Sequence, residues 1–209
     1  MILTDADKAY RQIKEKIITV ELPPGSVIRE ADLMAELGLG RTPIREALKK
    51  IQAENLVTVV PRRGMFVAGI TITDLQQIYE VRVELEGLCA RLAVERITPE
   101  QRAAMRRLVA EMQVADPADK QHLITLDRRF HHLLAEAAGN RFLRSEFERF
   151  YNLSLRIWHL ALNRVQSSDL DLSAHAEILS AIEAGDAERA MRRMQEHIRH
   201  FHDTIRKYL

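Results

Sequence analysis

The 209-residue sequence has few residues of the kinds that stabilise small secreted domains or membrane-spanning helices. It has one cysteine, Cys89, which excludes a framework of internal disulfides. Cys89 lies among Leu85, Leu88 and Leu92, so we expect it to belong to a hydrophobic core. No apolar run is long enough to cross a bilayer, and no signal peptide is recognisable. We therefore expect a cytoplasmic protein with no membrane partner.

Aromatic residues are also scarce, at 5% of the chain, whereas hydrophobic residues make up 46% and can supply substantial cores. Leucine, alanine, glutamate and arginine dominate the composition, which favours helices over sheets. The length suits one small and one medium-sized domain.

The sequence has almost no net charge, because the formal balance of the whole chain is +1. Basic charge is nevertheless concentrated in residues 41–63, where six basic side chains stand against two acidic ones, a balance of +4. The six are Arg41, Arg45, Lys49, Lys50, Arg62 and Arg63. An ordinary solvated basic helix is the alternative, but a local excess of this kind is typical of a surface that binds nucleic acid.

Residues 25–48 have the pattern of a helix, a tight turn and a second helix. Thr42 can cap the second helix, and Pro43 suits the first helical position because its missing N–H would be unpaired there. Ile44, Leu48 and Ile51 then recur at helical spacing and face a small core. The pattern predicts a helix that begins near residue 42.

The opposite face of this second helix is basic, because Arg41, Arg45 and Lys49 are spaced four residues apart. Arginines at the start of such a helix can make a bidentate contact with guanine O6 and N7, worth about 1–3 kcal/mol of discrimination each. Lys49 and Lys50 are better suited to phosphates, which contribute affinity without reading the sequence.

Two runs that resemble β-strands follow, at residues 56–60 and 65–67. The tetrapeptide between them contains Arg62, Arg63 and Gly64; the glycine lets the chain turn, and arginines at such a tip can enter a minor groove. The order predicts a winged helix-turn-helix, which places one helix in the major groove of double-stranded DNA.

These motifs resemble the GntR family of bacterial transcription regulators over residues 8–69. The matching residues are Pro24-Gly25, Leu37-Gly38, the run from Arg41 to Leu48 and the run from Pro61 to Gly64. One departure is Gly40, where the family usually has serine or threonine. The resemblance implies that Arg41, Arg45 and the wing contact DNA. The full set of predicted DNA-binding residues is Arg41, Thr42, Arg45, Lys49, Arg62, Arg63 and Gly64.

Helical periodicity without any strand pattern continues after residue 70. Six helices are expected, over residues 74–96, 98–114, 116–139, 141–164, 172–184 and 186–206. Thr73 with Gln76, and Thr98 with Gln101, are expected to form capping boxes, and Asp116-Pro117 is expected to open the third helix. The sequence is therefore predicted to be mainly α: a winged helix-turn-helix over 1–70, then an antiparallel six-helix bundle over 71–209. The resemblance to the GntR family implies that this second domain binds an effector and dimerises.

Four titratable side chains are predicted to point into this bundle from three helices. Asp127 and His131 share an apolar face four residues apart, His175 lies on the face of Ile178 and Ile182, and His197 lines up with apolar positions of the last helix. Buried polar groups need partners. One carboxylate and three imidazoles suit a divalent transition metal, although histidines on apolar faces are often satisfied core residues.

This part of the chain resembles the ligand-binding domain of the FadR-like branch in its metal-binding form, over about residues 74–206. The matching residues are Asp127, His131, the run from His175 to Asp186, and His197-Ile198. The resemblance implies a metal held by these four side chains, with zinc expected and nickel, manganese or iron as alternatives. In relatives the pocket beside the metal takes small carboxylates or sugar acids.

Candidate effector contacts are Arg82, Asn152 and Arg156. Arg82 lies on the inner stripe of its helix, four residues before Glu86, and a buried arginine can hold a carboxylate through two hydrogen bonds. An internal ion pair between Arg82 and Glu86 is the alternative.

The sequence thus predicts a dimeric regulator that binds a palindromic operator and whose affinity responds to a small organic acid bound near the metal. Three alternatives remain: a metal-dependent enzyme fused to a DNA-binding module, a regulator whose metal is purely structural, and a regulator that responds to fatty acyl-CoA. The residues do not distinguish a repressor from an activator.

Overall fold

The computed structural model describes residues 3–166 and 172–208, and its contacts divide the chain into two compact units. One unit contains the described residues up to Thr71 together with 155–160, and the other contains the remaining described residues. Each unit has its own buried core.

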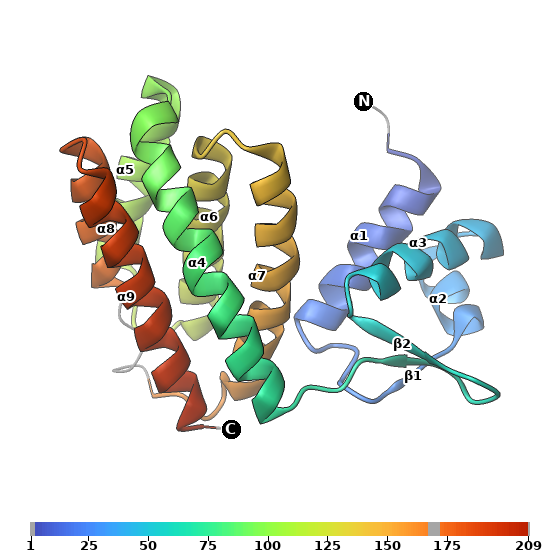
Figure 1. Cartoon of the computed structure of the whole chain (residues 1–209). Coiled ribbons are helices and arrows are strands. Elements are labelled where there is room, and N and C mark those ends of the chain that lie inside the picture. Colours follow the sequence, from blue (N-terminus) through green and yellow to red (C-terminus); the bar gives the residue numbers. More distant parts are fainter. Residues whose placement is uncertain (1–2, 167–171, 209) are drawn as a thin grey trace. The chain divides into compact units, whose positions relative to one another are not determined.

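The first unit is a winged helix-turn-helix (Figure 1). Its elements are α1 (Asp5–Ile18), β1 (Val27–Ile28), α2 (Glu30–Leu37), α3 (Arg41–Ala53), β2 (Val57–Val60) and β3 (Gly64–Val67). The three strands form an antiparallel sheet in the order β1-β3-β2, with Val57 opposite Val67 and Val60 opposite Gly64. Helix α1 packs on α3, and Ile44, Leu48 and Ile51 are fully buried, as their spacing predicts.

The start of α3 differs from the sequence prediction. Gly40 occupies the N-cap position, with no side-chain cap, and Arg41 is the first helical residue. Thr42 therefore does not cap the helix, and Pro43 is its third residue rather than its first. A proline is tolerated there because the N–H groups of a helix's first turn have no intrahelical partner. The preceding turn is formed by Gly38, whose φ of 63° is left-handed and ends α2.

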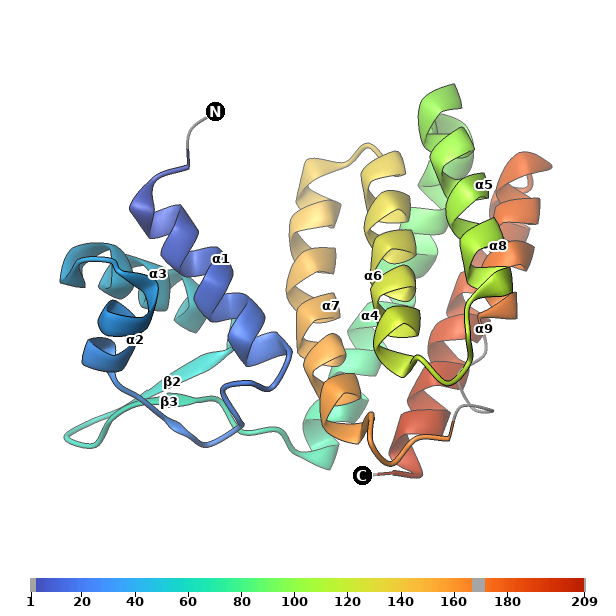
Figure 2. The same cartoon turned by 180° about the vertical axis from the view of Figure 1, so that it is seen from behind.

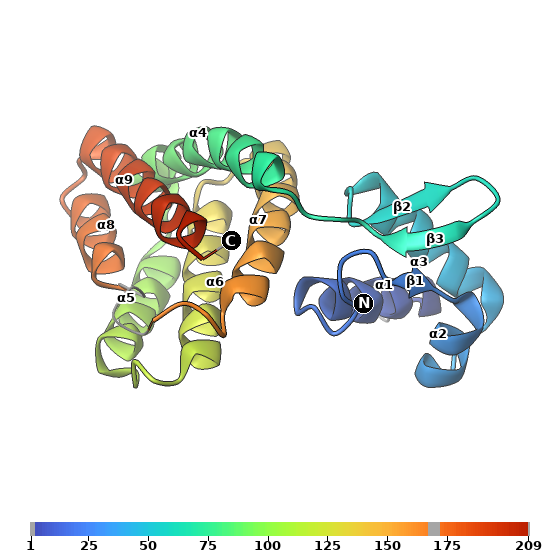
Figure 3. The ribbon, with the colours of Figure 1, turned by 90° about the horizontal axis from the view of Figure 1, so that it is seen from below.

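The second unit is helical, and no strand occurs in the described part of the chain after Val67. Its helices are α4 (Ile72–Arg96), α5 (Pro99–Val114), α6 (Lys120–Ala137), α7 (Arg141–Ala161), α8 (Ser173–Glu183) and α9 (Ala187–Arg206), and residues 155–160 of α7 are assigned to the first unit. Helix α4 packs against α9, α6 and α8, while α5 packs against α6 and α8 (Figures 2 and 3). The mainly helical fold class is confirmed.

The ends of these helices follow capping groups that the sequence reveals only in part. The capping box of Thr98 and Gln101 is present. Helix α4 begins at Ile72, so Thr73 lies within the helix and the expected box with Gln76 is wrong. Helix α6 begins later than expected because Asp119, not Asp116, accepts the hydrogen bond of a first-turn N–H. Helix α7 ends at Ala161, three residues before the expected end.

Candidate functional site

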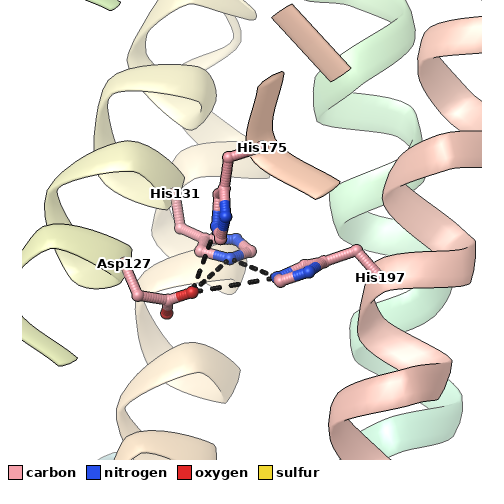
Figure 4. A group of neighbouring side chains, drawn as sticks. All are labelled: Asp127, His131, His175 and His197. Atoms are coloured by element: carbon pink, nitrogen blue, oxygen red, sulfur yellow. Dashed lines mark hydrogen bonds and ion pairs between the residues drawn. The ribbon is translucent and has the colours of Figure 1, made fainter. Parts of the chain in front are cut away.

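Three helices of the second unit bring together the four residues that the sequence singles out as metal ligands (Figure 4). Asp127 and His131 lie one turn apart on α6, His175 lies on α8 and His197 on α9. One ligand atom from each residue lies within 4.8 Å of the others. Helix α6 presents its pair because residues four apart share a face, and the other two imidazoles come from helices that pack together.

The four ligand atoms surround a small volume. Asp127 Oδ1 lies 3.2 Å from His175 Nε2, 3.4 Å from His131 Nε2 and 3.8 Å from His197 Nε2. The Nε2 atoms of His131 and His197 are 3.1 Å apart. Asp127, His131 and His175 are buried, while the His197 side chain is 9% exposed and is the most exposed of the four.

The outer atoms of the cluster have hydrogen bonds that orient it. Tyr151 donates its hydroxyl to Asp127 Oδ2 at 2.9 Å, and His175 Nδ1 donates to the carbonyl oxygen of Leu172 at 3.0 Å. His131 Nδ1 donates to the Glu86 carboxylate. A proton held on Nδ1 leaves the Nε2 lone pair free, and such outer partners are typical of histidines that bind metals.

The donor set fits a divalent metal ion. His175 Nε2 is buried and has no hydrogen-bond partner among the described residues, which is costly for a polar atom unless something else binds it. The Nε2 atoms of His131 and His197 lie at hydrogen-bond distance from each other, so they share a proton when no ion is bound. An ion among the four atoms would bind His175 Nε2 and replace that proton, and a carboxylate with three imidazoles is a coordination set for a first-row transition metal.

The charges of the ion-free cluster are strongly coupled. Burial favours a neutral Asp127, but His131 and His175 outweigh it and hold the pKa of that carboxyl well below its usual range. Burial also opposes a charged His131, yet Asp127 and Glu86 raise its pKa to about 9. Burial, with His175 and His131 nearby, lowers the pKa of His197 well below its usual range. In the ion-free cluster Asp127 is therefore charged and His131 keeps a proton, which a bound metal ion would displace.

The internal ion pair considered for Arg82 is present. Arg82 Nε lies 2.6 Å from Glu86 Oε1, and its Nη1 donates to Ser154 Oγ at 2.5 Å. The guanidinium also lies over the Tyr151 ring, 5.0 Å from its centroid. Glu86 thus joins Arg82 to His131, a link that sequence reasoning missed because the contact between Glu86 and His131 crosses from α4 to α6.

The two other candidate effector residues have different surroundings. Asn152 is buried, and its Oδ1 has no hydrogen-bond partner among the described residues. Arg156 is fully buried and donates to the backbone carbonyl of Ala68, which belongs to the same compact unit. Arg82 is thus the candidate that adjoins the metal cluster, through Glu86.

A pocket of about 210 Å³ is lined by residues of α8 and α9. His197 forms part of its wall, and Arg193 lies in it between Glu177 at 3.2 Å and Glu196 at 2.9 Å. His197 is thus the cluster residue that this pocket shares with the candidate ion site.

The predicted DNA-binding side chains are exposed on the first unit. Arg41, Thr42, Arg45 and Lys49 lie on the outer face of α3, Arg62 and Arg63 lie in the turn between β2 and β3, and Gly64 begins β3 directly after that turn. Gly64 has a φ of 105°, and Arg62 has a left-handed φ of 65°. Sequence reasoning missed Glu30, at the start of α2, which lies 3.2 Å from Arg41 Nε and 3.4 Å from Arg45 Nε.

Comparisons with known proteins agree with both units. Residues 5–67 match the model for bacterial regulatory proteins of the gntR family, and residues 77–200 match the FCD domain. The chain is 30% identical over 208 residues to the HTH-type transcriptional repressor GlaR of Escherichia coli (strain K12), covering 95% of this chain and 94% of GlaR. It is 24% identical over 199 residues to the repressor RspR of the same strain, covering 95% and 87%.

Solved structures show the same fold. The chain superposes on E. coli McbR/YncC with a TM-score of 0.87 at 22% identity, covering 99% of each chain. A metal-free FCD domain of TM0439, described as a putative transcriptional regulator, gives a TM-score of 0.55 at 20% identity, covering 68% of this chain and 97% of that one.

A helix-turn-helix domain followed by an FCD domain defines a bacterial transcription regulator rather than an enzyme. The chain belongs to the gntR family, in its FadR-like branch. Within the described residues, no helix is both long and apolar enough to span a bilayer.

Proposed function

We propose that the chain is a repressor that binds a palindromic operator as a homodimer, and that a small organic acid bound beside a divalent metal changes its affinity for that operator. Residues 1–70 bind DNA in this proposal, and residues 71–209 bind the effector and dimerise. The observation that carries the proposal is the convergence of Asp127 Oδ1 with three histidine Nε2 atoms inside the bundle. The names of GlaR and RspR, both repressors, support repression.

Zinc is the proposed ion, since a carboxylate and three imidazoles are among its usual ligands, and nickel, manganese or iron can use the same set. When bound, the ion supplies a Lewis-acidic position for one oxygen of a carboxylate or sugar acid. Asp127, His131, His175 and His197 hold it, and Tyr151 and Glu86 orient two of these ligands.

The effector is proposed to be anionic because a buried guanidinium and a buried amide, those of Arg82 and Asn152, lie in the same unit as the cluster. Arg82 is the proposed anchor, with Asn152 and Arg156 as further contacts. An incoming carboxylate would compete with Glu86 for the Arg82 guanidinium, so acid binding and the internal ion pair are coupled. A bound acid alters DNA affinity only if it binds the DNA-competent and the DNA-incompetent arrangements with different affinity.

The proposed DNA contacts are Arg41, Thr42, Arg45, Lys49, Arg62, Arg63 and Gly64. The recognition helix α3 presents the first four residues to the major groove, and the wing presents the other three to the backbone or minor groove. Two protomers would place two such helices on two half-sites, which requires an operator with matching two-fold symmetry.

The test uses an operator obtained by selecting duplexes from a random-sequence pool with the metal-loaded protein. Affinity for the selected duplex is then measured while small carboxylates and sugar acids are added one at a time. We expect at least one acid to change the affinity of the zinc-loaded protein and to leave a His175→Ala variant unaffected. If no acid changes operator affinity while the ion still raises the melting temperature, the metal is structural and the effector proposal fails.

A further inference from the structure

Helix α2 places one carboxylate against both arginines that α3 presents to DNA. Glu30 Oε2 lies 3.2 Å from Arg41 Nε, and Glu30 Oε1 lies 3.4 Å from Arg45 Nε. Among the described residues, neither guanidinium has another ion-pair or hydrogen-bond partner. The Glu30 side chain is 25% exposed, against 72% for Arg41 and 58% for Arg45, so the carboxylate lies behind the two cations.

The contacts with Glu30 leave the terminal Nη groups of both arginines free. An arginine can contact guanine O6 and N7 through its two terminal Nη groups. Because Glu30 contacts the Nε atoms, both pairs of Nη groups remain available. One carboxylate thereby restricts two long side chains that would otherwise sample many rotamers, and restricting them before binding lowers the entropic cost of the bound state.

We propose that Glu30 is a positioning residue for sequence readout: it holds Arg41 and Arg45 with their Nη groups outward and suppresses their binding to phosphates. This inference rests on the proposed role of α3 in reading DNA. In a duplex with guanines at matching positions, the bases are contacted by Nη donors that are already oriented before binding. A duplex without them meets arginines whose charge is already partly neutralised, so Glu30 weakens non-specific binding more than specific binding.

Helix α2 offers a matched control for the charge itself. Asp32 lies two residues after Glu30 on the same helix and is exposed, and within residues 3–166 and 172–208 its one ion pair is with Arg29, at 4.0 Å. Glu30→Gln and Asp32→Asn each remove one negative charge from α2, but only the first releases Arg41 and Arg45. Both variants should fold, because exposed ion pairs contribute little to stability, and melting temperatures check this.

The experiment measures the dissociation constants of the metal-loaded full-length protein for its selected operator and for a scrambled duplex of the same composition. For Glu30→Gln we expect tighter binding to the scrambled duplex, a salt dependence steeper by about one unit of log–log slope for each phosphate gained, and discrimination reduced by about fivefold to tenfold. Asp32→Asn should change both affinities by the same factor and leave the discrimination ratio intact.

Equal behaviour of the two variants, or unchanged discrimination by Glu30→Gln, would overturn the positioning role. Arg45→Ala separates this failure from failure of the proposed function. If Arg45→Ala loses discrimination while Glu30→Gln keeps it, the positioning role of Glu30 is excluded and the proposed recognition by α3 stands. If Arg45→Ala itself keeps full discrimination, α3 does not read DNA through Arg45, and the positioning role fails together with the proposed recognition surface.

Discussion

The Nε2 atom of His175 lies 3.2 Å from Oδ1 of Asp127, although the two residues come from different helices. The same imidazole donates through Nδ1 to the Leu172 carbonyl, which fixes its tautomer and leaves Nε2 buried, with no hydrogen-bond partner in the part of the chain that the structure describes. A buried acceptor of this kind destabilises an ion-free protein and stabilises an ion-bound one. The pair therefore links the fold of the bundle to the binding of a cation.

Replacing His175 by alanine should weaken metal binding by more than about 100-fold, because loss of a ligand costs more than loss of an outer partner, for which about 10- to 100-fold is typical. Titration against a chelating indicator measures the affinity. His200→Ala is the control, since His200 lines the same α8–α9 pocket but does not converge on the cluster. Equal metal affinity in the two variants would exclude the assigned ligand set.

Replacing Glu86 by glutamine should lower metal affinity about 10- to 100-fold without removing a ligand, because His131 loses the carboxylate that accepts its Nδ1 proton. The same change leaves Arg82 as a buried charge without its counter-ion, so the melting temperature should also fall. Glu84→Gln, on an exposed position of the same helix, should alter neither quantity. A lower melting temperature with unchanged metal affinity would limit Glu86 to a structural ion pair.

Arg45→Ala and Lys49→Ala should weaken DNA binding in different ways. Loss of the Arg45 contact should cost about 1–3 kcal/mol of discrimination against the wrong base. Loss of Lys49 should weaken selected and scrambled duplexes alike and reduce the salt slope by about one. Binding to both duplexes at several salt concentrations separates the two effects. If Arg45→Ala weakened binding to both duplexes equally, Arg45 would be reassigned as a phosphate contact rather than a base contact.

Asn152→Leu should preserve or raise the melting temperature, because the substitution removes a buried Oδ1 that has no hydrogen-bond partner among the described residues. If Asn152 contacts the effector, the same variant should lose part of the response of operator affinity to the acid while still binding the metal. Thermal melts and operator titrations with and without the acid test both parts. If operator affinity of the variant responded to the acid as in the wild-type protein, Asn152 would not be an effector contact.

Gly64→Ala should destabilise the winged unit by about 1 kcal/mol or more, because its φ of 105° is strained for a residue with a side chain. Gly69→Ala is the control: Gly69 has no left-handed φ, and a Cβ there meets no atom within 4 Å. Denaturant melts of the two variants give the difference. Equal stability would indicate that the wing turn rearranges freely.

The sequence predicted features that depend on spacing along one element. Asp127 and His131 share a face because they are four residues apart, and Ile44, Leu48 and Ile51 are buried for the same reason. Two contacts between elements escaped prediction, since the links from Glu86 to His131 and from Glu30 to the α3 arginines depend on how helices pack. The choice of N-cap residue among close neighbours also escaped prediction, because Gly40, not Thr42, occupies the N-cap of α3.

Short elements were missed for a related reason. Strand β1 has two residues, Val27 and Ile28, too few to show an alternating pattern, and it exists because its backbone pairs with β3. Helix α6 begins after Asp119 because that carboxylate, rather than the equally suitable Asp116, reaches a first-turn N–H. Asp116 instead accepts from Ala118 in the preceding turn.

The most direct test of the metal-centred account is the metal content of the untagged protein, measured by elemental analysis after incubation with zinc or nickel and desalting. We predict about one equivalent of a divalent transition metal per chain, and its loss in the His175→Ala variant. A wild-type protein that retains no metal after this treatment would contradict the account, and the four converging side chains would then be a buried polar network.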